Sequence, residues 1–471
     1  MKRKYFVMMI VCFAAIINNI IAQTWSTVGT GINNYGRVGA MCEYNGELYV
    51  GGVFDSIGGI PAISIARWNG AMWDSVPGIY SISRYLNLPL SVEIFDMKVY
   101  NGELIVAGTT WENGNQFRGI AKWNGTTWSQ LGTGMDNRIF SIEVYNGELF
   151  ATGHFEHAGG IPTRGIARWN GIVWDSVGGP GLNLSPGFSG SALQTYNGEL
   201  YLAGGFGLIN GLPVHSIARW NGVVWDSVGT FGQYGSFESL EVYNNKLYTG
   251  GGININNNPA ILWISRWDNA SWDSVGTGVN SAPNNMTVYN NELYAAGNFD
   301  SAGTNQALCI ARWDGLQWNT VGSGLDLFHI NQDTMIIGFD TIISQREHIY
   351  SMYTYNNELY VGGIFSMIGG INANSIAKWH IIGASVNEIQ NGEDGITIYP
   401  NPVSESVTIS INEKQRHAGE IVFYNVMGEK CLTKEMKAQR ETVDVSALAS
   451  GIYFVEVRTQ NSAVRKKIVK L

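Results

Sequence analysis

The sequence is poor in charge, cysteine and proline. Charged residues make up 14% of its 471 positions, and it contains only 4 cysteines and 11 prolines. Low charge combined with 45% hydrophobic residues excludes an intrinsically disordered chain, which needs the opposite balance. So few cysteines in so long a chain exclude a small domain held together by disulfides.

The cysteines are also scattered. Cys12 lies in the N-terminal apolar run, which leaves Cys42, Cys309 and Cys431 in distant segments of the remaining chain. An odd number at such separations indicates no disulfide framework. Cys42 and Cys309 stand in apolar, strand-like sequence, so we expect them to be small buried hydrophobic residues.

Long apolar runs are absent except at the N-terminus. The basic residues 2–4 are followed by an apolar run over 5–17 and by the small residue Ala22. This order is typical of a secretory signal peptide, which we predict to span residues 1–22. The run is shorter than the roughly 20 apolar residues that a spanning helix needs, so we expect no transmembrane segment after signal cleavage.

Basic residues are scarce in the main part of the chain. Residues 23–385 carry 15 Lys and Arg against 27 Asp and Glu, whereas residues 386–471 carry 11 of each. A net acidic domain repels phosphate backbones. We therefore expect no nucleic-acid partner.

What the sequence does contain is a strong internal repeat. The phrase Tyr-Asn-Gly-Glu-Leu-Tyr, with variations, begins at Tyr44, Tyr100, Tyr145, Tyr196, Tyr243, Tyr289 and Tyr355. About twenty residues after each copy, a basic residue precedes a tryptophan, and in the first six copies another tryptophan follows five positions later. Such periodicity is the signature of a repeat architecture.

Each copy predicts four short strands. In the first copy they cover residues 38–44, 47–54, 63–68 and 72–76, with Asn-Gly turns after the first and third. Asn-Gly between apolar, alternating segments is a strong hairpin signal. A four-stranded meander of this length is a propeller blade, so seven copies predict an all-β chain with a seven-bladed β-propeller over residues 23–383.

The ends of the repeat region complement each other. The seventh copy stops after Trp379 without its fourth strand, while residues 25–28 form a similar strand alone before the first copy. We predict that this N-terminal strand completes the seventh blade and closes the ring, because closure removes exposed strand edges. Basic residues of the third strands should pair with acids of the fourth strands, as Arg67 with Asp74, and serve as scaffold.

A resemblance can be stated for residues 24–383. The Gly51-Gly52 and Gly204-Gly205 pairs that end second strands, with the downstream tryptophans, resemble kelch or galactose-oxidase-type repeats. The resemblance implies the propeller fold. It does not extend to chemistry, because the chain has no copper-ligand set, and we expect no cofactor.

The repeat ends after Gly383. Residues 384–395 are a polar linker, and residues 396–471 show the alternation of a small β-sandwich. This segment resembles the type A C-terminal sorting domain of type IX secretion substrates, and an ordinary adhesive sandwich is the alternative. The resemblance rests on a motif that includes Tyr399, Pro400, Asn401, Pro402, Gly428, Gly451, Tyr453, Lys466 and Lys467. It implies type IX machinery as a partner, and a secreted or outer-membrane surface-attached protein.

No catalytic motif stands out, and His154 with His157 lacks metal-ligand spacing, so we expect no metal site. We expect a surface binding or adhesion module for a protein or glycan, with its ligand on the face of variable connections. Candidate ligand-face residues are Trp111, His157, Trp263, Asp55 and Asp300. The alternative is a secreted glycan hydrolase or lyase with a site assembled from several blades.

Truncation tests the sorting assignment. A chain that ends at Ala384 should accumulate in the periplasm, because it lacks the segment that the secretion machinery would recognise, while the full chain reaches the surface or the medium. Cell fractionation and immunoblotting measure the distribution. Equal surface delivery of both chains would show that residues 385–471 do not direct export.

Overall fold

The computed structural model describes most of the chain, with gaps. The described residues are 22–32, 36–77, 79–82, 89–109, 118–182, 189–214, 216–229, 236–253, 262–326, 336–337, 340–341, 347–382, 396–399, 403–411, 419–425, 430–436, 438–449, 451–458 and 463–470. They form strands and turns without a helix, which confirms the all-β prediction. Most of the predicted signal peptide lies outside the described residues.

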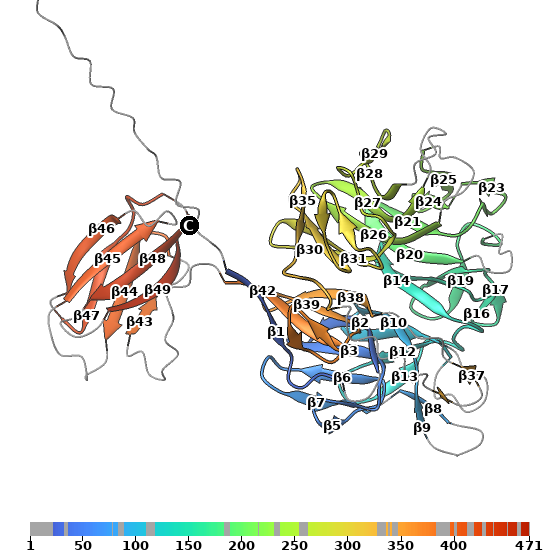
Figure 1. Cartoon of the computed structure of the whole chain (residues 1–471), viewed down its shortest axis with the longest axis horizontal. Coiled ribbons are helices and arrows are strands. Elements are labelled where there is room, and N and C mark those ends of the chain that lie inside the picture. Colours follow the sequence, from blue (N-terminus) through green and yellow to red (C-terminus); the bar gives the residue numbers. More distant parts are fainter. Residues whose placement is uncertain are drawn as a thin grey trace, which may run out of the picture. The chain divides into compact units, whose positions relative to one another are not determined.

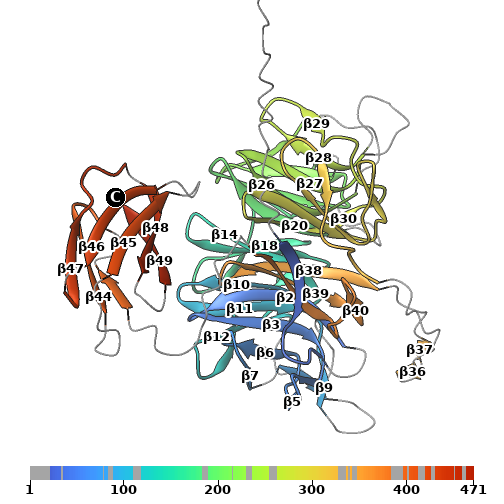
Figure 2. The same cartoon turned by 60° about the vertical axis from the view of Figure 1, so that its left-hand side comes forward.

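The chain divides into two compact units. One spans Gln23–Ile381, and the other contains Ile382–Leu471. The larger unit holds seven four-stranded antiparallel sheets, which follow one another along the chain (Figures 1 and 2). The predicted domain boundaries at 22, 383 and 395 stay predictions.

Six sheets are built from consecutive repeat copies. The first contains β2 (Arg37–Tyr44), β3 (Glu47–Val53), β6 (Ile65–Trp68) and β7 (Trp73–Ser75). The second to fourth contain β10 (Ile94–Tyr100), β11 (Glu103–Gly108), β12 (Ile120–Trp123) and β13 (Trp128–Gln130); β14 (Ile139–Tyr145), β15 (Glu148–Gly153), β18 (Ile166–Trp169) and β19 (Trp174–Ser176); and β20 (Gly190–Tyr196), β21 (Glu199–Gly204), β24 (Ile217–Trp220) and β25 (Trp225–Ser227). The fifth and sixth contain β26 (Ser236–Tyr243), β27 (Lys246–Ile253), β28 (Leu262–Trp267) and β29 (Trp272–Ser274); and β30 (Pro283–Tyr289), β31 (Glu292–Gly297), β34 (Ile310–Trp313) and β35 (Trp318–Thr320).

The seventh sheet combines both ends of the repeat region. Its strands are β38 (His348–Tyr355), β39 (Glu358–Ile364), β42 (Ile376–Ile382) and, at the edge, β1 (Ala22–Thr27). Figure 1 shows blue β1 beside orange β42. Trp25 of β1 packs on Trp379 with ring centroids 4.9 Å apart, as Trp68 packs on Trp73 in the first sheet at 5.1 Å.

Short hairpins that the sequence analysis did not predict lie between the second and third strands of five sheets. They are β4 (Ser56–Ile57) with β5 (Ile60–Pro61), β16 (His157–Ala158) with β17 (Ile161–Pro162), β22 (Leu208–Ile209) with β23 (Leu212–Pro213), β32 (Ser301–Ala302) with β33 (Asn305–Gln306), and β40 (Met367–Ile368) with β41 (Ile371–Asn372). Two further two-stranded sheets join β8 (Tyr80–Ile82) to β9 (Pro89–Ser91) and β36 (Ile336–Ile337) to β37 (Asp340–Thr341).

The first strand of each sheet carries the tyrosine of the repeat, and we call β2, β10, β14, β20, β26, β30 and β38 the leading strands. Each contacts the leading strand of the next sheet, and β38 contacts β2. Tyr44 Oη donates to Gly102 O at 3.2 Å in the next sheet's turn, and Tyr355 Oη donates to Gly46 O at 2.8 Å in the first sheet's turn. The five intervening tyrosines donate in the same way, from Tyr100, Tyr145, Tyr196, Tyr243 and Tyr289. Contacts between sheets thus run in a cyclic series.

A glycine in each second strand permits a β-bulge in the leading strand. The register between β2 and β3 shifts at Val38/Ala40, and a Cβ on Gly52 would lie 2.0 Å from Arg37 O. No side chain fits at that distance, so only glycine allows the two backbones to approach. The same contact recurs at Gly108, Gly153, Gly204, Gly251, Gly297 and Gly363. This is the physical reason for the one glycine that every second strand of the repeat shares.

The C-terminal unit packs two sheets around an apolar core. One sheet contains β43 (Ile396–Tyr399), β44 (Ser406–Ile411) and β47 (Arg440–Asp444), and the other contains β46 (Lys430–Met436), β45 (Gly419–Asn425), β48 (Gly451–Arg458) and β49 (Ala463–Lys470). Val407, Phe423 and Val455 are among its fully buried residues. Two packed antiparallel sheets agree with the predicted sandwich.

Two of the cysteines lie in the core. Cys42 and Cys309 are 5% and 2% exposed, and each belongs to a hydrophobic cluster of the larger unit. The expectation that they act as small buried hydrophobic residues is confirmed.

The position of β1 can be tested by shortening one side chain. Trp25→Ala removes the ring contact with Trp379 and the bond from Nε1 to Val321 O at 3.3 Å. Truncating a buried tryptophan costs about 3–5 kcal/mol, so thermal unfolding of the larger unit should shift to clearly lower temperature. Deleting residues 23–30 should shift it further.

Trp128 provides the matched control, because it occupies the same position in the second sheet but is only half-buried. Trp128→Ala should lower the midpoint less than Trp25→Ala. A fall as large as that of Trp25→Ala, or no fall for Trp25→Ala, would contradict the placement of β1 at the edge of the seventh sheet.

Candidate functional site

The candidate ligand-face residues are placed in separate parts of the larger unit. Trp111 lies outside the described residues. Trp263 stands on β28, half-buried against the hydrophobic cluster between the fifth and sixth sheets. Asp55, His157 and Asp300 lie at the short hairpins of the first, third and sixth sheets, which are not consecutive. The structure therefore does not bring Asp55, His157 and Asp300 together in one site.

His157 and Asp300 are tied to the connection that arrives from the preceding sheet. Asp136 accepts from the His157 backbone N–H at 3.0 Å and lies 2.7 Å from its ring Nδ1. Asn280 takes the equivalent place for Asp300, accepting from its N–H at 3.1 Å and donating to its carboxylate at 2.6 Å. These contacts hold the hairpins, so they give both residues a structural role.

The basic residue of each third strand is paired on both sides in several sheets. Arg67 forms the predicted ion pair with Asp74, and it also contacts Glu47 at 3.2 Å. The sequence analysis missed the glutamate, although it stands in the Tyr-Asn-Gly-Glu-Leu phrase two residues before the partner of Arg67 in the register. Such half-exposed pairs contribute about 0–1 kcal/mol each and leave no unpaired cation to hold an anion.

A polar cluster joins the leading strands of the second, third and fifth sheets. Lys98 of β10 forms an ion pair with Glu143 of β14. Asp96 Oδ2 accepts from the Ile142 N–H at 2.8 Å, which links the same two strands. Glu241 of β26 accepts from the N–H of its neighbour at 2.9 Å.

Burial raises the pKa of Asp96 to about 6, against the opposing attraction of Lys98. Burial likewise raises the pKa of Glu241 to about 7, against its backbone hydrogen bond and the charge of Lys98, and with the repulsion of Glu143. Burial disfavours the charged lysine too, but attraction to Glu143 and Asp96 outweighs it and raises the pKa of Lys98. Raised carboxyl pKa values occur at functional sites and in structural networks alike.

Comparison of equivalent positions in the repeat indicates a structural role for Asp96. Ser141 and Asn285 occupy the same position, four residues before the repeat tyrosine. Each also accepts from a backbone N–H of the next leading strand, at 3.2 Å for Ser141 and 3.1 Å for Asn285. Asp96 thus performs a bond that neutral side chains perform elsewhere in the repeat.

A second cluster lies at the beginning of the leading strands, and we call it the start-of-strand cluster. Arg37 forms an ion pair with Glu93 of the next sheet, and its guanidinium lies 5.7 Å from the ring centre of Tyr350. The rings of Tyr350 and His348 lie 4.6 Å apart. Burial lowers the pKa of His348, so its imidazole is neutral at neutral pH.

The cluster continues into the second and third sheets through aromatic rings. Phe95 contacts Phe140 edge to face at 5.2 Å, and Phe140 contacts His154 at 5.6 Å. All three side chains are half-buried. The sequence analysis missed this cluster, although aligning the repeats on their tyrosines would have placed Phe95, Phe140 and Tyr350 at one position.

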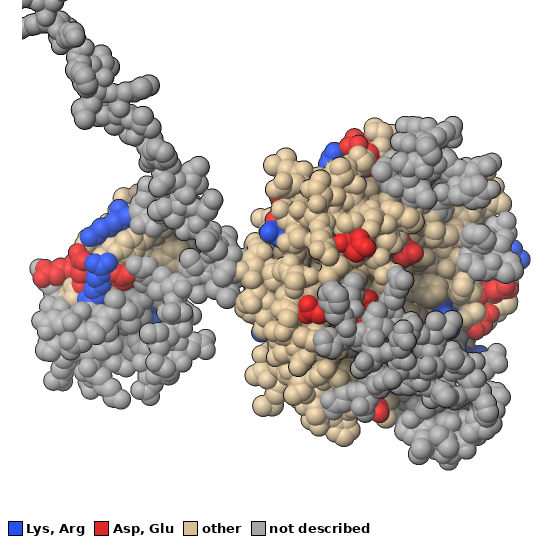
Figure 3. All heavy atoms as spheres, viewed as in Figure 1, with Lys and Arg blue, Asp and Glu red and all other residues tan. Residues whose placement is uncertain are grey.

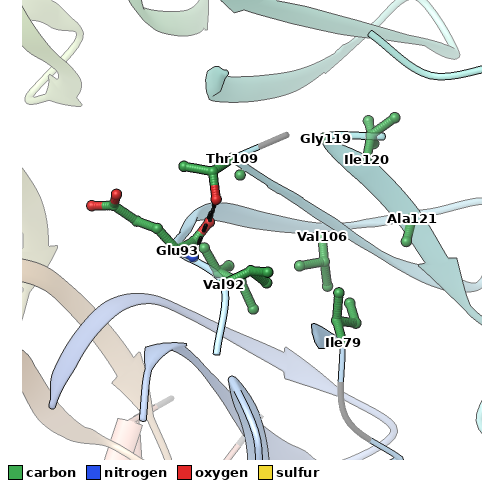
Figure 4. Close-up of a pocket in the computed structure, with 10 residues that line it drawn as sticks. Ile79, Val92, Glu93, Val106, Thr109, Gly119, Ile120 and Ala121 are labelled. Atoms are coloured by element: carbon green, nitrogen blue, oxygen red, sulfur yellow. Dashed lines mark hydrogen bonds between the residues drawn. The ribbon is translucent and has the colours of Figure 1, made fainter. Parts of the chain in front are cut away.

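Two hollows among the described residues differ in size and in how far they are enclosed. A cavity of about 20 Å³ beside Val92, Val106 and Ile120 has room for one water molecule at most (Figure 4). Its polar end is filled by Thr109, which hydrogen-bonds the backbone of Glu93. An open depression of about 620 Å³ follows residues 300–308 on the β32–β33 hairpin.

The surface of the larger unit carries both exposed apolar side chains and acidic side chains. Ile172, Val173, Val223 and Val224 are 81%, 54%, 76% and 56% exposed at the turns between third and fourth strands of two consecutive sheets. On the face seen in Figure 3, acidic side chains are prominent near the middle, in keeping with the acidic balance of this unit. Among the described residues, no three His, Cys, Asp or Glu side chains are grouped to hold a metal ion.

The sorting-motif residues fall on strands where they are described. Tyr399 ends β43, Gly451 begins β48, and Lys466 and Lys467 lie on β49. Tyr453 is buried, and its hydroxyl donates to Ala449 O at 3.0 Å. Pro400, Asn401, Pro402 and Gly428 lie outside the described residues.

Residues 397–471 match the family described as a secretion system C-terminal sorting domain. The predicted type IX sorting domain is confirmed over these residues. Because this segment addresses its carrier to the type IX machinery, the chain is an exported protein of the cell surface or the medium. Within the described residues, no helix has the length and apolar character to cross a membrane.

Similarity to solved structures is distant. The extracellular domain assigned to a hybrid two component system of B. thetaiotaomicron aligns with 11% identity and a TM-score of 0.44, over 96% of this chain and 59% of that one. The extracellular domain of a one component system from the same organism aligns with 13% identity and a TM-score of 0.43, over 95% of this chain and 59% of that one. A structural genomics protein of unknown function from Bacteroides thetaiotaomicron VPI-5482 aligns with 11% identity and a TM-score of 0.38, over 76% of each chain.

The chain thus spans 59% of the length of the first two structures. With TM-scores under 0.5, these similarities carry no argument about its fold or function. No curated protein matches the chain.

The raised pKa of Glu241 predicts a pH-dependent stability. A carboxyl whose pKa rises on folding holds its proton more tightly when folded, so its contribution is complete below the unfolded pKa near 4.5 and is lost as the pH rises through about 7. Glu241→Gln should therefore raise the unfolding temperature at pH 8 and leave it nearly unchanged at pH 4.

Asp74→Asn is the control of opposite sign. The hydrogen bond from Arg67 lowers the pKa of Asp74, so this substitution should lower the unfolding temperature slightly at pH 8. Calorimetry measures the change in unfolding temperature for each of the two variants at pH 4 and at pH 8. A Glu241→Gln shift that is equal at pH 4 and pH 8 would show that the charge of Glu241 is not the cause.

Proposed function

We propose that the chain is an exported seven-bladed β-propeller that binds a protein or glycan at the cell surface or in the medium. Residues 1–22 are its signal peptide, residues 23–383 the propeller, residues 384–395 a linker and residues 396–471 the sorting domain, which engages the type IX machinery. The propeller is supported by the cyclic series of contacts between the seven leading strands. The hydrogen bonds of the repeat tyrosines support it as well, because they link the first sheet to the second and, at the end of the series, the seventh sheet to the first.

The contrast between the two ends of the sheets carries the binding proposal. At one end the turns between first and second strands have two residues with positive φ, as Asn45 at 51° and Gly46 at 78°, and the tyrosine bonds lock them. At the other end the connections 76–93, 131–138, 177–189 and 321–347 differ in length. Loops on a rigid scaffold can vary without harm to the fold, and binding sites concentrate there.

The enzyme interpretation, a glycan hydrolase or lyase, has one observation in its favour, the raised pKa values of Asp96 and Glu241. Catalytic acids are tuned in this way. Asp96, however, makes the interstrand bond that Ser141 and Asn285 also make, so scaffolding accounts for its position. Binding without turnover is therefore the function that the geometry supports better.

A comparison of the two faces tests the proposal. Mature protein is screened on a glycan array and against purified surface proteins, and each ligand found is measured by biolayer interferometry. Trp111→Ala, at a residue that the sequence analysis predicts for the long-connection face, should weaken binding at least tenfold. Ile172→Thr with Val223→Thr, on the turn face, should leave it within twofold, because Thr126 occupies the same turn position in the second sheet.

Loss of binding with the turn-face variant alone would place the ligand on the wrong face for this proposal. Release of reducing ends from a bound glycan would favour the enzyme. The absence of any ligand in both screens would contradict a binding function.

A further inference from the structure

The leading strands can be aligned on their repeat tyrosines, position by position. Counting back from the repeat tyrosine, the third and the sixth positions are buried in every leading strand, as Met41 and Val38 are in β2. The fifth position back holds Gly39, Phe95, Phe140, Ser191, Glu238, Asn284 and Tyr350, and none of these residues is buried. Because consecutive leading strands contact one another, these seven residues lie at one level, near the end where the long connections enter.

The aromatic residues at this level are not required by the fold. Ser191, Glu238 and Asn284 occupy the same position in the fourth, fifth and sixth sheets, with the same bulged register as Phe95 and Phe140. A large aromatic ring that is left half-exposed loses part of the free energy it would gain by burial. Aromatic rings in three sheets of one arc therefore need a reason other than packing.

The arc continues through the sheet that has no ring at this level. The first sheet contributes Gly39, where a Cβ would lie 2.2 Å from Ile94 O, so no side chain fits there. Arg37 of the same strand extends its guanidinium to 5.7 Å from the Tyr350 ring instead. The seventh, first, second and third sheets thus contribute a continuous arc of half-buried aromatic rings and one guanidinium.

The opposite arc has complementary chemistry. It offers the Ser191 hydroxyl, the Glu238 carboxylate and the Asn284 amide at the same level of the fourth to sixth sheets. Ring faces on one side and hydrogen-bonding groups on the other suit a molecule with an apolar C–H face and a hydroxylated edge. A pyranose has both.

Charge decides which saccharide fits. The Arg37 guanidinium is balanced by its ion pair with Glu93, and burial keeps His348 neutral by lowering its pKa. Arg138, whose charge acts on Arg37, adds one positive charge, and Glu238 adds a carboxylate that offsets it on the other side of the ring of residues. The site has no excess of positive charge with which to hold a polyanion.

We propose that the start-of-strand cluster, with Ser191, Glu238 and Asn284 opposite, is a binding site for an uncharged saccharide whose sugar ring stacks on Tyr350 or Phe140. This inference rests on the proposed binding function and names its ligand class and its residues. It places the ligand among the ends of the leading strands and away from Trp263, which packs against the hydrophobic cluster of the fifth and sixth sheets.

The repeat supplies substitutions that should fold. Phe140→Ser introduces the residue of the fourth sheet, and Tyr350→Asn that of the sixth, at a position whose backbone is the same. Native gel electrophoresis of the mature full chain is run in gels that contain laminarin, mannan, arabinoxylan, hydroxyethyl cellulose or, as the charged probe, polygalacturonate. Thermal unfolding verifies that each variant is folded.

Wild-type protein should be retarded by at least one of the four neutral polymers. The double variant Phe140→Ser/Tyr350→Asn should raise the dissociation constant for that polymer at least tenfold, whereas Trp263→Ala should change it less than twofold. Equal retardation of wild type and double variant, or a tenfold loss with Trp263→Ala alone, overturns the site while the binding function stands.

Retardation by polygalacturonate alone overturns the uncharged ligand class. Retardation by no polymer overturns the inference. In that case the screen against surface proteins decides whether the wider binding function stands or fails with it.

Discussion

The larger unit depends on one hydrogen bond that is repeated from sheet to sheet, the bond from the tyrosine hydroxyl to a carbonyl in the next turn. Tyr44 and its six counterparts are buried, so each hydroxyl needs a partner inside the protein. The partner is supplied by the second residue of an Asn-Gly or Asn-Asn turn, whose positive φ turns its carbonyl outward from the hairpin. The residues that form each turn therefore also determine how that sheet is joined to its neighbour.

At the outer edges of the sheets, tryptophan side chains also donate hydrogen bonds to backbone carbonyls of neighbouring connections. Trp73 Nε1 donates to Val28 O at 3.0 Å, so the indole of one sheet holds the connection that leaves the preceding sheet. Trp25 makes the same bond to Val321 O, although 296 residues separate the two. The N-terminal strand thus makes the same contact as its counterparts, although it is remote in sequence from β42, the strand with which it pairs.

A rigid frame of this kind explains how different chemistry can occupy equivalent positions. At the level of Phe95 and Phe140 the fold accepts serine, glutamate and asparagine, because the bulge and the glycine behind it determine the backbone there. At the level of Asp96 it accepts serine and asparagine, because any short acceptor can bond the next strand. The repeat sets the frame, and its individual copies can specialise.

The sequence by itself determined the all-β class, the number of repeat copies, the strands of each copy, the Arg67–Asp74 type of pair and the sorting segment. Each of these follows from turn dipeptides, alternation and fixed spacing along the sequence. Only the tertiary structure decided which distant groups meet. The Lys98–Glu143 pair, the raised pKa of Glu241 and the contact of Arg37 with Tyr350 all depend on neighbours in other sheets. Burial and electrostatic interaction follow distance in space, and a local pattern carries no information about that distance.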